Sequence, residues 1–249
     1  MTMESVNPTT GECMARHELW RAADLERALA QVAAATLAWQ ATAFEERARL
    51  LRNAATELRA RNEDHARLIT REMGKPIREA RAEVEKCAWA CEYYAEHAAA
   101  MLHDDIVATD ATRSCVTYQP LGTLLAVMPW NFPYWQVLRA AAPALMAGNT
   151  VLLKHSSNVP QCALAIEEVF QRAGFPAGVF RALLISGAQA EALIADSRLH
   201  AVLPAARPPA GAWRRPPVRP SRNRCLSSAD PIRSWCWPTP TWNWPRASA

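Results

Sequence analysis

Three side chains that could act together on a carbonyl substrate, Asn131, Trp135 and Arg139, follow one another at intervals of four residues. They come directly after the apolar stretch 122–128, which indicates a buried strand. An amide can donate a hydrogen bond to a polarised carbonyl oxygen, an aromatic ring can form a wall, and a guanidinium can bind a carboxylate. On a helix this spacing would bring all three to one face. A purely structural interpretation makes Asn131 a helix cap, Trp135 a core residue and Arg139 half of a surface ion pair.

The elements that must position these residues alternate regularly along the chain. Apolar stretches with the length of strands alternate with amphipathic stretches with the length of helices: 122–128, 133–148, 149–155, 159–174, 178–185, 187–196 and 199–202. This alternation predicts βαβ units, and therefore an α/β fold with a parallel sheet covered on both faces. The loop that carries Trp130 and Asn131 would then lie at the carboxyl edge of the sheet, where such folds bind nucleotides by default. Neither a G-x-G-x-x-G motif nor a P-loop is present to identify the ligand.

The first hundred residues predict helices over 24–42, 44–61 and 76–101. The last of these carries one apolar stripe that runs from Ile77 to Met101 and includes Cys87 and Cys91, which we interpret as small core residues. After this helix, the β-prone stretches 106–108 and 114–119 predict a two-stranded hairpin.

Composition divides the chain near Val202. Residues 203–249 hold ten of the 18 prolines, five of the ten tryptophans and eight arginines, with Asp230 as their one acidic residue. Residues 1–202 are mildly acidic, so the net charge of +4 comes from the tail and does not predict nucleic-acid binding by the folded part. The seven cysteines show no metal-ligand spacing and no disulfide pattern, so we expect no metal site. No signal peptide or membrane-spanning run is evident, so we expect a cytoplasmic protein without a membrane partner.

Several long motifs resemble the aldehyde dehydrogenase superfamily, and most closely its succinate-semialdehyde dehydrogenases. They occur in the family's order: "SVNPTTGE" at 5–12, "REMGKPIREARAEVEKCAWACEYYAEHA" at 71–98, "MPWNFPYWQ" at 128–136, "ALMAGNTVLLKHSSNVP" at 144–160 and "AGFPAGVF" at 173–180. The resemblance covers about residues 6–202. It implies N-terminal helices of the cofactor domain (1–105), an oligomerisation hairpin (106–119), a partial Rossmann-like region (120–202) and an irregular tail (203–249). It also implies that the intact relative is a homo-oligomer.

The resemblance implies roles for the candidate residues. Asn131 matches the side-chain donor of the oxyanion hole, and Arg139, beside Trp135, matches the guanidinium that binds the distal carboxylate of a semialdehyde. Trp130 matches the cofactor cleft, and Lys154 matches the residue that binds the adenine ribose. Ser157 stands where a carboxylate usually makes the family prefer NAD, so NADP should be tolerated as well as NAD.

Two further residues of the family, a Glu in an E-L-G-G motif and the nucleophilic Cys, have no counterpart in this chain. Read two nucleotides further on with GC-rich codons, residues 226–245 permit E-L-G-G-S-D-P-F and the sequence that follows it in the family. We therefore expect that the tail is an out-of-frame translation and that the chain is an inactive, truncated aldehyde dehydrogenase. The alternatives are a non-catalytic dinucleotide-binding or interaction protein and, for the tail alone, a nucleic-acid-binding segment.

Overall fold

A four-stranded parallel sheet forms the centre of the structure, a computed structural model that describes residues 2–204. Its strands are β5 (Thr123–Met128), β6 (Thr150–His155), β7 (Phe180–Ala182) and β8 (Ala201–Pro204), in the order β7-β6-β5-β8. The helices between them are α5 (Trp135–Met146), α6 (Pro160–Arg172) and α7 (Gly187–Leu193). Each strand pairs in parallel with its neighbours, so the predicted α/β class with a parallel sheet is confirmed.

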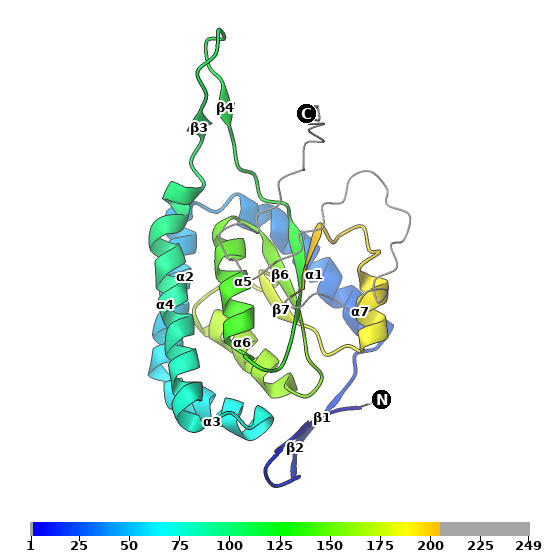
Figure 1. The fold of residues 1–249 in the computed structure, drawn as a ribbon. Helices are drawn as coiled ribbons and strands as arrows, with labels where there is room; N and C mark the ends of the chain where they lie inside the picture. Colours follow the sequence, from blue (N-terminus) through cyan, green and yellow to red (C-terminus); the bar gives the residue numbers. More distant parts are fainter. Residues whose placement is uncertain (1, 205–249) are drawn as a thin grey trace, which may run out of the picture.

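Both faces of the sheet are covered, as the apolar strands predicted. On one face, Leu125 and Leu152 pack with residues of α7 and of α1 (Ala22–Gln40). The other face packs against α5 and α6, and beyond them against α2 (Phe44–Ala60), α3 (Asn62–Met73) and α4 (Ile77–Met101). Figure 1 shows α1 and α7 on one side of the strands and α4 on the other.

The helix α4 follows the predicted apolar stripe closely. Cys87 and Cys91 are fully buried in the core, and burial raises the pKa of the Cys91 thiol to about 12. Met101, at the end of the stripe, is exposed instead, because the helix ends there. The two cysteines are therefore structural residues, as the sequence indicated.

Two strands near the N-terminus and one helix were not predicted. The strands β1 (Thr2–Val6) and β2 (Cys13–Glu18) pair antiparallel around the turn at residues 7–12, where Gly11 has φ +72°. Their side chains are too polar to show a clear alternation. The helix α3 was missed because acidic and basic residues dominate its sequence, although it buries Ala66 and Ile69.

The predicted hairpin after α4 is present but shorter than expected. It consists of β3 (Asp105–Ile106) and β4 (Cys115–Val116), which extend away from the body of the molecule (Figure 1). Ile106 and Val116 are exposed. At the other end of the described chain, β8 reaches Pro204, so the first two residues of the predicted irregular tail (203–249) belong to a strand. The rest of that tail, from residue 205 onward, lies outside the described residues. No helix within residues 2–204 is long and apolar enough to cross a membrane.

Candidate functional site

The loop after β5 and the turn after β6 emerge next to each other at the carboxyl edge of the sheet. The two strands end in register, with Met128 opposite His155. Trp130 and Asn131 lie on the loop that follows Met128, and both are exposed. Ser157 lies on the turn that follows His155 and is also exposed. The register of β5 and β6 therefore places three of the predicted site residues at one edge of the sheet.

The helix that follows this loop begins two residues later than predicted, at Trp135 instead of near Pro133. Asn131 therefore precedes the helix by four residues and does not share a helical face with Trp135 and Arg139. Asn131 does not cap the helix either, because the side chain of Glu83 binds the backbone N–H groups at the start of the helix. Oε1 of the buried Glu83 accepts hydrogen bonds from the backbone N–H groups of Tyr134 (2.9 Å) and Trp135 (3.0 Å).

Glu83 is itself held by a buried partner. Its other carboxylate oxygen forms an ion pair with the ammonium group of Lys75, and both side chains are almost completely buried. The same ammonium lies 3.7 Å from the ring centroid of Phe132, in the loop beside Asn131. The ion pair thus connects the start of α4 with both the loop and the first turn of α5.

His155, the last residue of β6, links the loop to the sheet through a hydrogen bond. Its Nδ1 accepts a hydrogen bond from the backbone N–H of Ser156 (2.9 Å), so Nε2 carries the proton and donates to the carbonyl oxygen of Pro133 (2.9 Å). Burial lowers the pKa of His155 to about 4, so the ring is neutral at neutral pH. Lys75, Glu83 and His155 were not identified from the sequence, because only the tertiary fold brings α4 and β6 to this loop.

Two cations lie on the helices around Trp135. The half-buried indole ring of Trp135 has the ammonium of Lys86, on α4, 4.0 Å from its centroid. Arg139 follows one turn later on α5 and is half-buried. Within residues 2–204 neither cation pairs with a carboxylate, so the surface ion pair considered for Arg139 is absent from the described structure.

Lys154 reaches the carboxyl edge from within β6. It is 8 % exposed, and burial lowers the pKa of its ammonium group. Its Nζ donates to the carbonyl oxygen of His155 (2.5 Å), which engages one of the three N–H groups of the ammonium. A buried ammonium with remaining donors, beside an edge that bears the exposed Ser157 and Trp130, fits the hydroxyl and phosphate groups of a dinucleotide.

No described cysteine is exposed at this edge. Cys87, Cys91 and Cys162 are buried in helices, and burial raises the pKa of each thiol. Cys13 and Cys115 are exposed, but they belong to the hairpins β1–β2 and β3–β4. A nucleophilic thiolate needs a lowered pKa and access to the substrate. The described cysteines do not combine these two properties at the carboxyl edge.

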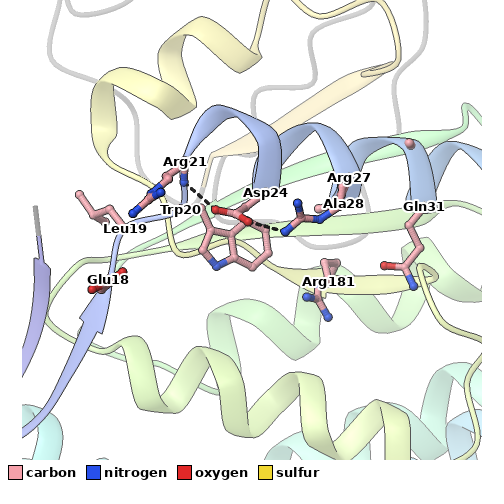
Figure 2. A pocket seen from close by; sticks show the side chains of 10 residues that line it. Glu18, Leu19, Trp20, Arg21, Asp24, Arg27, Ala28, Gln31 and Arg181 are labelled. Atoms are coloured by element: carbon pink, nitrogen blue, oxygen red, sulfur yellow. Dashed lines mark hydrogen bonds and ion pairs between the residues drawn. The ribbon is translucent and has the colours of Figure 1, made fainter.

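A cavity of about 760 Å³ lies elsewhere, between α1 and β7. Figure 2 shows Trp20, Gln31 and Arg181 around it. Its lining includes none of the six predicted site residues. Arg27 pairs with Asp24 (2.5 Å) at its wall, and Arg181 pairs with Glu167 (2.7 Å). The cavity is therefore distinct from the carboxyl-edge site.

Known proteins similar to this chain are aldehyde dehydrogenases. A model of the aldehyde dehydrogenase family matches residues 1–204. The chain is 49% identical over 212 residues to the "Probable succinate-semialdehyde dehydrogenase" of Synechocystis sp., named for NADP(+), across 85% of this chain and 47% of that protein. It is 48% identical over 198 residues to the succinate semialdehyde dehydrogenase Sad of Escherichia coli, named for NAD(P)+, across 80% of this chain and 43% of that protein.

A solved structure agrees with these matches. The succinic semialdehyde dehydrogenase of Streptococcus pyogenes, in complex with NADP+, has a TM-score of 0.79 and 34% sequence identity, across 81% of this chain and 45% of that chain. The chain thus spans less than half the length of each of these three proteins. Because the family model matches residues 1–204, the chain belongs to the aldehyde dehydrogenase family.

Proposed function

We propose that this chain provides the cofactor-binding and oxyanion-binding part of an NADP- or NAD-dependent succinate-semialdehyde dehydrogenase. The full chain would bind the dinucleotide but would not oxidise an aldehyde. The observation that carries the proposal is the common carboxyl edge of β5 and β6, which end in register: Lys154 lies near the end of β6, and Asn131 and Ser157 lie on the segments that follow the two strands. The names of the relatives support this choice of substrate and cofactor.

Each residue has a separate part in the proposed reaction. The amide N–H of Asn131 would donate to the aldehyde oxygen, where negative charge develops when a nucleophile attacks the carbonyl carbon. Glu83, Lys75 and His155 hold the loop on which Asn131 lies. Trp135 would form a wall for the aliphatic part of the substrate, and Arg139 would bind its distal carboxylate.

The cofactor would lie across the edge formed by Trp130, Lys154 and Ser157. When bound, its nicotinamide supplies the acceptor for the hydride that leaves the substrate. Lys154 would donate to the hydroxyl groups of the adenine ribose. Ser157 is neutral and exposed, so it does not repel the negative charge of a 2′-phosphate. The site should therefore accept NADP as well as NAD.

The proposal also covers the segments of the chain that lie outside this edge. The hairpin at residues 106–119 would mediate association with further copies of the protein, and its exposed Ile106 and Val116 support this role. Residues beyond the family match would come from a displaced reading frame. DNA sequencing tests that origin, because the displaced frame must continue as an aldehyde dehydrogenase with the E-L-G-G motif and the nucleophilic Cys.

Two measurements on the full chain test the proposed function. Calorimetric titration should show binding of NADP+, whereas an interaction protein without a dinucleotide site would show none. An assay with succinate semialdehyde and NADP+ should show no formation of NADPH, because the described cysteines are either buried or distant from the edge. Turnover that disappears when one cysteine is replaced would identify a nucleophile and contradict the predicted inactivity.

A further inference from the structure

Lys86 occupies an unusual position for a surface lysine. It is exposed on α4, yet its ammonium lies 4.0 Å from the ring centroid of Trp135 on the neighbouring helix α5. A cation over an indole face is held by the negative charge of the ring, which restricts the freedom of the long side chain. Lys86 is thereby held beside the residue that the proposed function places along the substrate.

The charge of Lys86 is not balanced by the carboxylates nearest to it in the sequence. Glu83, three residues earlier and thus on the same side of the helix, pairs with Lys75. Glu85 pairs with Arg59 (2.8 Å). The facing helix α5 contains no acidic residue at all, and its one charged residue is Arg139. Two cations therefore lie near Trp135, and no salt bridge to either is present in the part of the chain that the structure describes.

We propose that Lys86 is a specificity-determining residue that binds the distal carboxylate of the substrate together with Arg139. This inference rests on the proposed function and extends it. A carboxylate has two oxygens with about four lone-pair positions, so a guanidinium and an ammonium can both donate to it. The two residues come from different helices, α4 and α5, so they can approach a bound carboxylate from two directions. The site should therefore prefer short aldehydes that carry a terminal carboxylate, and their unreactive analogues, as ligands.

Succinamate is a suitable probe, because it carries the same carboxylate as succinate semialdehyde but an unreactive amide in place of the aldehyde. It cannot form a Schiff base with Lys86. Butyramide, which has a methyl group in place of the carboxylate, serves as the uncharged control ligand. Binding of both to the full chain is measured by calorimetry or ligand-observed NMR at low ionic strength, where charge effects are largest.

The variants distinguish the contributions of Lys86 and Arg139 to succinamate binding from each other and from a general effect of net charge. We expect Lys86→Met to weaken succinamate binding about fivefold and Arg139→Met to weaken it about tenfold or more, with butyramide binding unchanged. Lys86→Arg should restore most of the affinity, because it keeps the charge. Arg78→Met is the matched control: it removes one positive charge from the same helix, about 12 Å away along its axis, and should leave both affinities unchanged.

The outcomes distinguish this inference from the proposed function. If Arg139→Met loses succinamate affinity and Lys86→Met retains it, Lys86 only packs against Trp135, and the inference is overturned while the proposed function stands. If the unmodified chain does not prefer succinamate to butyramide, the proposed carboxylate site fails and the inference fails with it. If Arg78→Met weakens binding as much as Lys86→Met, the effect is one of net charge, which also overturns the inference. Thermal unfolding of each variant, followed by circular dichroism, verifies that the fold is retained.

Discussion

The carboxyl edge of the sheet and the cavity of Figure 2 differ in how their charges are arranged. At the cavity, two of the three arginines, Arg27 and Arg181, pair with carboxylates. Near the edge, on the helices α4 and α5, Lys86 and Arg139 lack such partners among the described residues. The edge loops are instead held by buried groups, Glu83 above all. Hollow shape and unpaired positive charge therefore occur in different regions of this protein, and the proposed function assigns ligand binding to the region with the unpaired charge.

The largest expected effect concerns the buried ion pair under the loop. Glu83→Ala should lower the free energy of unfolding by about 3–5 kcal/mol, because it leaves the buried ammonium of Lys75 without a partner. Arg27→Ala, at the cavity, breaks an exposed pair and should change stability by about 0.5 kcal/mol or less. Urea unfolding of the two variants measures both effects. Equal losses in the two variants would show that the loop is not held more firmly than the cavity wall.

The stability of the edge should also depend on pH. Burial lowers the pKa of His65 and His155 from 6.5 to about 4, so both rings are neutral in the folded chain where the unfolded chain would bind protons. Their contribution to stability is therefore present above pH 6.5 and is lost as the pH falls toward 4, at up to about 1.4 kcal/mol per pH unit for each ring.

His155→Gln tests this dependence, because its amide is long enough to donate to Pro133 from the position of Nε2 but does not titrate. Urea unfolding across this pH range should show about half of the histidine-dependent slope remaining, since His65 still contributes. The same substitution at the exposed His103 is the control and should leave the slope unchanged. An unaltered slope in His155→Gln would mean that this ring does not contribute to the pH dependence of stability.

A smaller effect is expected on cofactor choice. Ser157→Glu should weaken NADP+ binding about tenfold and make NAD+ the preferred cofactor, because a carboxylate repels the 2′-phosphate and accepts hydrogen bonds from the ribose. Ala30→Glu places the same charge on the exposed lining of the cavity and should leave the preference unchanged. Calorimetric titration with both cofactors gives the ratio. A clear NAD+ preference in the unmodified chain would contradict the role of Ser157.

The sequence predicted the sheet more successfully than the geometry of the site. Regular alternation of apolar strands and amphipathic helices was enough for β5 to β8 and their helices, because burial on both faces leaves a strong periodic signal. The start of α5 was predicted too early, because the N–H groups of its first residues are bound by Glu83, about 50 residues earlier in the chain. No local pattern records such a contact, nor the bond from His155 to Pro133.

The place where NADP+ binds tests the central claim most directly. Calorimetric titration of the full chain should show that Lys154→Met weakens NADP+ binding about tenfold, because the ribose loses a buried charged donor. Arg181→Met removes a cation from the cavity and should leave NADP+ affinity unchanged. The opposite result, with affinity lost in Arg181→Met and retained in Lys154→Met, would place the nucleotide in the cavity and contradict the carboxyl-edge site.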